Sequence, residues 1–291
     1  MRRAVPIGCL LLSACSFFEG DAPPEPADME IRVATLRVRQ RSADRAGRLA
    51  RLVSGLRAID ADIVALQDVL SFPDFTDELD WLQRQLHFQT RFEPSGHSFG
   101  AARLGFAVAS RFPILDSSAL TVGDLGHPLT IAQRVRLDTP LGPLDLINVR
   151  LLEPSCGAGS WSDQVDQLLR FAEEGVTHLT PILMGHFGQP PDSPSIARLT
   201  GALGGPAPML DVWRAARGYE AGPTQGLNLP RDFSSQERAE RVDYIFLDRE
   251  SASSDCLPAS VDRFCLDELA PPRERGSHCG VSARLLFRGG S

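Results

Sequence analysis

Short apolar segments of strand length are the feature of this chain that most constrains its fold. The segment IRVATLRVR (31–39) alternates apolar and polar residues, as a half-buried strand does. Other apolar segments of strand length are DIVALQDV (62–69), LGFAVASRF (104–112), 129–137, 144–151, PILMG (181–185), RVDYIFL (241–247) and VSARLLF (281–287). This many strands predicts more than one sheet.

Helical periodicity separates several of these strands. Apolar residues recur at helical spacing in 44–58, LDWLQRQL (79–86) has helical character, and 161–174 places its apolar residues on one side. Strands and helices mixed over about 260 residues predict an α/β or α+β domain. Long loops after Leu151 and between Gly218 and Val242 are candidates for building a site.

The N-terminal 29 residues are predicted to be a leader and a tether. Residues 1–15 combine a charged start with an apolar run too short to cross a bilayer. Leu12-Ser13-Ala14-Cys15 resembles the lipobox of bacterial lipoproteins, which predicts lipidation of Cys15. The alternative is an ordinary signal peptide in which Cys15 is incidental. Residues 16–29 are rich in proline and acids and are predicted to be a tether, which leaves a domain at 30–288.

Charge and cysteine usage limit the function further. The net charge of −7 gives no indication of nucleic-acid binding, which usually needs a basic surface. An exported chain meets an oxidising compartment, so disulfides among Cys156, Cys256, Cys265 and Cys279 are one expectation and free buried cysteines are the other. Four cysteines allow three pairings, of which Cys256 with Cys265 closes the shortest loop.

Seven segments resemble, in order, the motifs of the endonuclease/exonuclease/phosphatase superfamily. They are IRVATLRV, DIVALQDV, GFAVASRFPI, LDLINVRL, PILMGHFGQPPDS, RVDYIFL and GSHCGVSARL. Together they cover nearly the whole chain after the tether. The layout after residue 145, with WSDQVDQLLRFA, LDVWRAA and GPTQGLN, is most similar to the sphingomyelinase-like and DNase I-like branch.

The resemblance implies a fold and a chemistry. The fold is a four-layer sandwich, with two mixed β-sheets packed face to face and helices outside. The activity is hydrolysis of phosphodiesters with Mg²⁺, which takes oxygen ligands and polarises the phosphoryl group. The pocket lies at one end of the sheets.

Most of the family's site residues are substituted in the first half of the motif set. Arg37 stands where the family has an asparagine facing the phosphate, and Asp68 stands where it has a metal-binding glutamate. Arg150 replaces the histidine of Thr-His-Leu. In the Gly-Asp-Phe-Asn turn, the water-activating aspartate is His186 here, and the phosphate-binding asparagine is Gly188.

The second half of the motif set is better preserved. His278 matches the histidine of Ser-Asp-His, and Asp243 matches the aspartate that orients it. Ser277 replaces the aspartate of that motif, which in the family binds or organises the metal. Asn228, in GPTQGLN, lines the pocket by analogy, although an ordinary turn asparagine is an equal alternative.

These substitutions predict a domain that binds rather than cuts. Loss of a positioned general base alone costs about 10²–10⁴-fold in rate. We therefore expect little or no bound Mg²⁺ and a pocket in which Arg37 and Arg150 supply the positive charge. The predicted role is a binding or scaffolding domain for a phosphate-bearing ligand or a protein partner. It would be exported and lipid-anchored to the outer or the cytoplasmic membrane.

Three alternatives remain open at this stage. The first is an active phosphodiesterase of altered chemistry, such as a sphingomyelinase-like or nuclease-like hydrolase. The second is a surface module without a small-molecule site. The third is a softer ion, Zn²⁺ or Mn²⁺, held by Asp68, His186 and His278.

Overall fold

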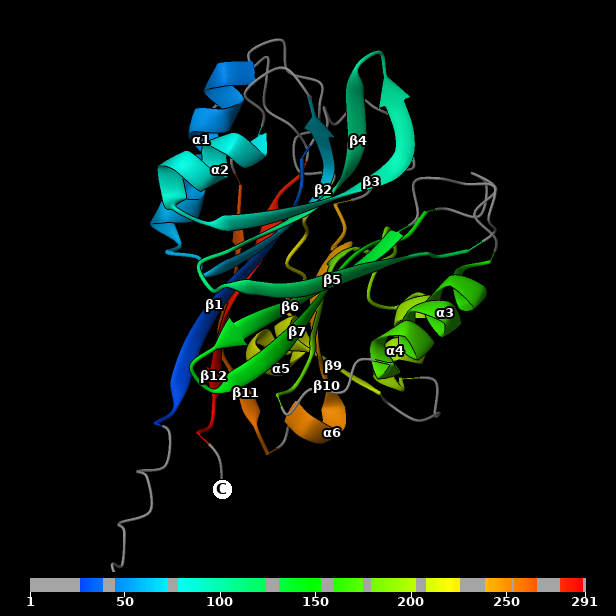
Figure 1. Cartoon of the computed structure of the whole chain (residues 1–291). Coiled ribbons are helices and arrows are strands. Elements are labelled where there is room, and N and C mark those ends of the chain that lie inside the picture. Colours follow the sequence, from blue (N-terminus) through cyan, green and yellow to red (C-terminus); the bar gives the residue numbers. More distant parts are fainter. Residues whose placement is uncertain are drawn as a thin grey trace, which may run out of the picture.

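Two six-stranded sheets packed against each other form the centre of the molecule (Figure 1). The computed structural model describes residues 27–38, 45–72, 78–123, 131–152, 160–174, 179–202, 208–225, 239–252, 254–265 and 278–289. Cys15, Cys156, Asn228 and Ser277 lie outside these residues. No helix in the described ranges is long and apolar enough to span a bilayer.

The first sheet has the strand order β11-β12-β1-β2-β4-β3. Its strands are β1 (Met29–Arg37), β2 (Ile63–Ser71), β3 (Gln89–Phe99), β4 (Ala102–Ser110), β11 (Cys256–Phe264) and β12 (Gly280–Phe287). Only β1 and β2 pair in parallel, so the sheet is mixed.

The second sheet has the order β5-β6-β7-β8-β10-β9 and is also mixed, with β7 and β8 in parallel. Its strands are β5 (Ile114–Thr121), β6 (Ile131–Thr139), β7 (Gly142–Arg150), β8 (Ile182–His186), β9 (Met209–Asp211) and β10 (Asp243–Asp248).

Two pairs of helices cover the outer faces of the two sheets. These are α1 (Arg45–Ala58) with α2 (Glu78–Leu86), and α3 (Trp161–Glu173) with α4 (Pro194–Thr200). The short helices α5 (Val212–Arg217) and α6 (Arg249–Ala252) instead contribute Val212, Trp213 and Ala252 to the cluster between the sheets. Leu52 of α1 and Leu82 of α2 share one buried cluster with the outward residues of β1 and β2. Val165 of α3 and Ile196 of α4 share another with β7, β8 and β10. Figure 1 shows these two helix pairs on opposite sides, which confirms the predicted four-layer sandwich.

The inward faces of the sheets form the third cluster, and strand alternation explains its membership. Every second residue of a strand points to the same face. The inward rows include Ile31 and Val33 of β1, Leu144 and Leu146 of β7, and Ile245 of β10, all buried. Each such side chain contributes about 1.5–3 kcal/mol by burial, so these rows hold the sheets face to face.

A buried pair of amide side chains connects the two sheets at one end of the apolar cluster between them. Gln67 Nε2 on β2 donates to Asn148 Oδ1 on β7 at 2.8 Å and to Thr35 Oγ1 on β1 at 2.9 Å. Asn148 Nδ2 donates in turn to the carbonyls of Leu66 and Ala107, at 3.1 Å each. These directional bonds fix the position of one sheet relative to the other. They lie next to the site, because Gln67 directly precedes Asp68.

The disulfide is not the one that closes the shortest loop. Cys265, at the end of β11, is bonded to Cys279, just before β12. Cys256 is a free buried thiol. The bond therefore ties the residue that follows His278 to the neighbouring strand.

Candidate functional site

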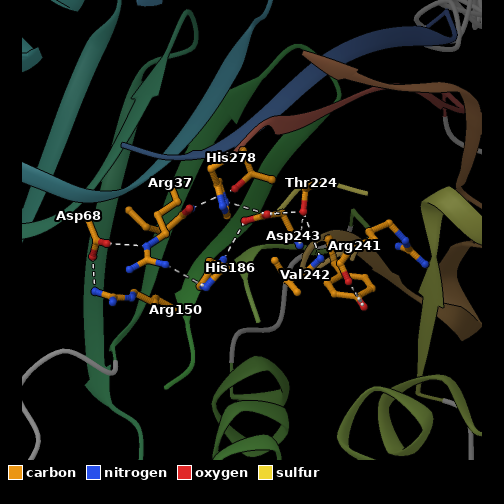
Figure 2. Close-up of polar contacts among 12 residues, drawn as sticks. Arg37, Asp68, Arg150, His186, Thr224, Arg241, Val242, Asp243 and His278 are labelled. Atoms are coloured by element: carbon orange, nitrogen blue, oxygen red, sulfur yellow. Dashed lines mark hydrogen bonds and ion pairs between the residues drawn. The ribbon is translucent and has the colours of Figure 1, made fainter. Parts of the chain in front are cut away.

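Six of the predicted site residues lie together at one end of the seam between the sheets (Figure 2). They are Arg37, Asp68, Arg150, His186, Asp243 and His278. Strand alternation brings four of them there, because Arg37, Arg150, His186 and Asp243 continue the inward rows of β1, β7, β8 and β10. The strand register agrees, since His186 pairs with both Arg150 and Asp243.

Asp68 reaches the site through an irregularity in β2. The pairing of β2 with β4 shifts between Gln67 and Val69, and Asp68 has a left-handed φ of 60°. Gln67 faces the other sheet, whereas Val69 belongs to the cluster under the helices. Asp68 is thus the extra residue of a β-bulge, and a bulge redirects a side chain that alternation would have aimed elsewhere.

Both carboxylate oxygens of Asp68 are bound by guanidinium groups. Arg37 Nε donates to Oδ2 at 2.6 Å, and Arg150 Nη1 donates to Oδ1. The carboxylate is 13% exposed and the Arg37 side chain 21% exposed. This half of the site is a cation–anion–cation row that faces solvent at Arg37.

Asp243 is the centre of the other half and is fully buried. His186 Nδ1 lies 3.1 Å from Oδ1, and His278 Nε2 lies 2.9 Å from Oδ2, although without the alignment of a hydrogen bond. Thr224 Oγ1 donates to Oδ2 at 2.6 Å and accepts from the backbone N–H of Val242 and Asp243. Two imidazoles and a hydroxyl therefore surround this carboxylate.

Arg37 connects the two halves and defines the proton on His186. Its Nη1 lies 3.4 Å from His186 Nε2. Because a guanidinium only donates, Nε2 must be the acceptor, and the ring proton sits on Nδ1, facing Asp243. His186 is thus a neutral imidazole held between a cation and an anion.

Burial and charge shift two pKa values in this cluster. Burial lowers the pKa of His186 to about 4, because desolvation of the imidazolium outweighs the attraction of Asp243. Burial opposes ionisation of Asp243, but the imidazoles of His278 and His186 outweigh it and hold the pKa of that carboxyl well below its usual range. At neutral pH the pair is therefore a carboxylate beside a neutral His186.

The turn after β8 leaves little space for the family's asparagine side chain. Gly188 has a φ of 67°, and a Cβ there would lie 3.1 Å from Cη2 of Trp161 and 3.8 Å from Nε2 of His186. Its N–H donates to the Val242 carbonyl at 3.3 Å. The indole of Trp161 thus lies in tight contact with the place where a side chain at position 188 would begin, and Gly188 offers a ligand neither a side chain nor its amide.

The alternative set for a softer ion, Asp68, His186 and His278, differs at one position from the group of donors that the structure brings together. The donor atoms of His186, Asp243 and His278 lie within 4.8 Å of one another, whereas Asp68 is not part of this group. The reason is the bulge: Asp68 points to Arg37 and Arg150, and Asp243 takes its place between the imidazoles.

Three features of the site were not predicted from the sequence. Thr224 lies in GPTQGLN, the motif from which only Asn228 was singled out, and Trp161 opens the helix WSDQVDQLLRFA. Arg241 forms a buried bidentate pair with Asp211, with Nη2 2.7 Å from Oδ2. That pair anchors the chain two residues before Asp243.

Comparison with known proteins supports the fold and the family. A sequence model described as the Endonuclease/Exonuclease/phosphatase family matches residues 30–261. A search of curated proteins found no match.

Three solved structures illustrate the similarity of fold. An endonuclease/exonuclease/phosphatase family protein from Leptotrichia buccalis C-1013-b has a TM-score of 0.66 at 16% identity, covering 87% of this chain and 98% of that chain. The human Nocturnin catalytic domain with bound sulfate anion has a TM-score of 0.67 at 17% identity, with coverages of 89% and 93%. D. rerio TDP2 complexed with single strand DNA product has a TM-score of 0.67 at 16% identity, with coverages of 88% and 98%.

Proposed function

The chain belongs to the endonuclease/exonuclease/phosphatase family, and on that premise we propose that it is an exported, membrane-tethered domain that binds a phosphate-bearing ligand without cutting it. The observation that carries the proposal is the pair of guanidinium groups on Asp68. They occupy both oxygens of the carboxylate that stands where the family places a metal ligand. Fixed positive charge from the chain itself then takes the place of the ion.

The residues present do not fit Mg²⁺, the ion on which the family's chemistry depends. Family members are generally dependent on divalent metal, and Mg²⁺ requires oxygen ligands in near-octahedral geometry. Asp68 gives its oxygens to Arg37 and Arg150, and His186 presents nitrogen where the family has a carboxylate. The mixed nitrogen and oxygen donors around Asp243 would suit a softer ion better.

Electrostatics favours an anion at the solvent-facing end of the cluster. With His186 neutral, the charges of Arg37 and Arg150 are balanced by Asp68 and Asp243, but the acid at 243 is fully buried while Arg37 is 21% exposed. Arg37 uses Nε and Nη1 within the cluster, and its Nη2 makes no hydrogen bond or ion pair with the described residues. A planar guanidinium fork binds phosphate well, which makes Arg37 the first contact for a ligand.

The leader supports a location at a bacterial membrane. A lipidated Cys15 with more than one acyl chain would anchor the protein stably. In a bacterial host, fatty-acid labelling of the chain and its recovery in the membrane fraction are the expected results. Loss of both in Cys15→Ser would support the anchor, and an unlabelled, fully released wild-type chain would refute it.

Calorimetry with inorganic phosphate, with and without Mg²⁺, tests the binding proposal. We expect binding that does not require Mg²⁺ and that the double variant Arg37→Ala/Arg150→Ala loses by at least tenfold. The matched control Arg57→Ala/Arg170→Ala removes two exposed helix arginines and should bind as the wild type does. Unchanged binding in the site variant would contradict an arginine-lined site.

A second candidate is an active phosphodiesterase of altered chemistry, which the retained Asp243–His278 contact favours. Metal-dependent turnover of bis-nitrophenyl phosphate that disappears in His278→Ala would establish it. The reversion set Arg150→His, His186→Asp, Gly188→Asn and Ser277→Asp distinguishes the two candidates by restoring the family's residues at four substituted positions. We expect the set to introduce turnover only if Trp161 is also made smaller, because its ring lies beside position 188.

A further inference from the structure

A cavity of about 550 Å³ lies between α3 and α4. Trp161, Leu169, Pro194, Ala197 and Pro208 contribute much of its wall, and the lining is mostly apolar. Its volume is within the range of pockets that bury small organic ligands. None of the six clustered site residues, among them Arg37 and Arg150, lines it.

The cavity and the cluster of site residues meet at Trp161. Trp161 lines the cavity, and its ring also lies against Gly188, next to His186 Nε2. The carbonyl oxygen of Leu151, the residue after Arg150, lies 3.7 Å from the position that a Cβ at residue 188 would take. Gln189, one residue after Gly188, is also in the cavity wall. Trp161 and Gln189 therefore connect the cavity wall to the turn that follows His186.

The walls of the cavity are held in place by polar contacts. Arg198 of α4 forms a bidentate pair with Asp166 of α3, at 2.7 and 2.9 Å. The Tyr244 hydroxyl donates to the Gln189 carbonyl at 2.8 Å. These contacts make the cavity a preformed feature of the fold.

We propose that the cavity binds the apolar part of the same phosphate ester whose phosphate contacts Arg37 and Arg150. This inference rests on the proposed function and narrows the ligand class to a phosphate ester with a compact alkyl or aryl group. The apolar wall supplies affinity by burial, and the guanidinium groups fix the orientation. Gly188 adds no side chain between the two parts, and a Cβ there would lie 3.1 Å from the Trp161 ring.

A series of phosphate esters tests the inference on the full chain in lipid nanodiscs. Calorimetry compares inorganic phosphate, methyl phosphate, butyl phosphate and 1-naphthyl phosphate, with uncharged 1-naphthol as the partner of the last. Each methylene that is fully buried strengthens binding up to about fourfold. We therefore expect butyl phosphate to bind at least tenfold more tightly than methyl phosphate. The butyl and naphthyl members distinguish an alkyl from an aryl ligand.

One substitution at the cavity and one away from it provide the control. Ser162 is an exposed residue of α3 that lines the cavity, so Ser162→Trp should fill part of it without disturbing the core. We expect butyl and 1-naphthyl phosphate to bind this variant no more tightly than methyl phosphate does, while its affinity for inorganic phosphate stays the same. Arg170→Trp adds the same ring at an exposed position of α3 that does not line the cavity, and should leave the advantage intact.

The outcomes separate this inference from the proposed function. If inorganic phosphate binds but the four phosphates bind equally well, the cavity is not part of the site and the inference is wrong while the proposed function stands. If 1-naphthol binds as tightly as 1-naphthyl phosphate, the cavity is an independent site, which also overturns it. If no phosphate binds, the proposed function fails, and the inference fails with it.

Discussion

Asp68 and Asp243 are two carboxylates of one site with opposite surroundings. Asp68 lies on a bulge near solvent between two guanidinium groups, whereas Asp243 is fully buried in a regular strand between two imidazoles and a hydroxyl. The first stands at a substituted position of the family pattern and the second at a retained one.

The difference shows how the partner of a carboxylate decides what the carboxylate can do. Guanidinium groups stay charged at any pH that a protein meets, so the row around Asp68 is a fixed electrostatic element. The imidazole of His186 titrates, so the cluster around Asp243 responds to pH. We infer that the substitutions gave one half of the site a permanent charge pattern and, through His186, gave the other half a titratable group.

Removing each carboxylate in turn should give the largest contrast. Asp243→Ala leaves two imidazoles and a hydroxyl without their partner in a fully buried place, and should lower the free energy of unfolding by about 3–5 kcal/mol. Asp68→Ala leaves the buried Arg150 and the partly exposed Arg37 without their carboxylate, and should cost less because Arg37 can be hydrated, about 2 kcal/mol. Urea denaturation measures both values. Equal losses would mean that burial does not distinguish the two acids.

Removal of the disulfide should act on the Asp243 half alone. Cys265→Ser/Cys279→Ser opens a link with a sequence separation of 14 residues, next to His278. We expect a loss of about 3 kcal/mol in unfolding free energy, from the greater freedom of the unfolded chain. Phosphate affinity, which depends on Arg37 and Arg150, should not change. A parallel loss of phosphate affinity would show that the two halves are coupled.

Acid should destabilise the protein through His186. Its pKa is about 4 when folded and near 6.5 when unfolded, so the unfolded state takes up the proton first. The contribution of neutral His186 to the free energy of unfolding is then present above pH 6.5, and that free energy falls by about 2 kcal/mol between pH 8 and pH 5. Thermal or urea unfolding across this range measures the slope. His186→Gln should flatten it, whereas Asp68→Ala should keep it; a slope retained in the glutamine variant would assign it to another group.

The smallest expected effect is at Thr224. Thr224→Val removes the hydroxyl that donates to Asp243 Oδ2 while keeping the shape of the side chain. A hydrogen bond to a charged group contributes about 1.5–3 kcal/mol, and the imidazoles around Asp243 remain, so we expect a loss at the lower end of that range. Thr224→Ser keeps the hydroxyl and should recover most of it. No difference between the two variants would exclude this bond as a support of the carboxylate.

The strands that the sequence did not predict are the four edge strands. β3, β5, β9 and β11 lie at the ends of the two sheets, and none of them has a continuous apolar alternation. In β3 and β5, most residues are exposed or half-buried. Edge strands carry polar residues that limit pairing with other chains, and this removes the pattern by which a strand is recognised. The inner strands were predicted because each has at least one continuous row of buried apolar residues.

The site shows the same limit at the level of single residues. Alternation places Arg37, Arg150, His186 and Asp243 on inward faces, and this much follows from the sequence. The ring of Trp161 beside Gly188 does not, because it depends on how α3 packs against the turn after β8. The orientation of Asp68 does not follow either, since a strand of nine residues carries no local signal for an extra residue.

The bulge at Asp68 also determines which change the strand can survive. Deleting any other residue of β2 would reverse the facing of every side chain beyond the gap, and so would exchange core for surface. Deleting Asp68 would not, because Gln67 already faces the opposite sheet and Val69 the helices. Asp68 is therefore the residue of β2 whose deletion leaves every other side chain of the strand on its present face of the sheet. A variant that lacks it would have Arg37 and Arg150 without the carboxylate that now lies between them.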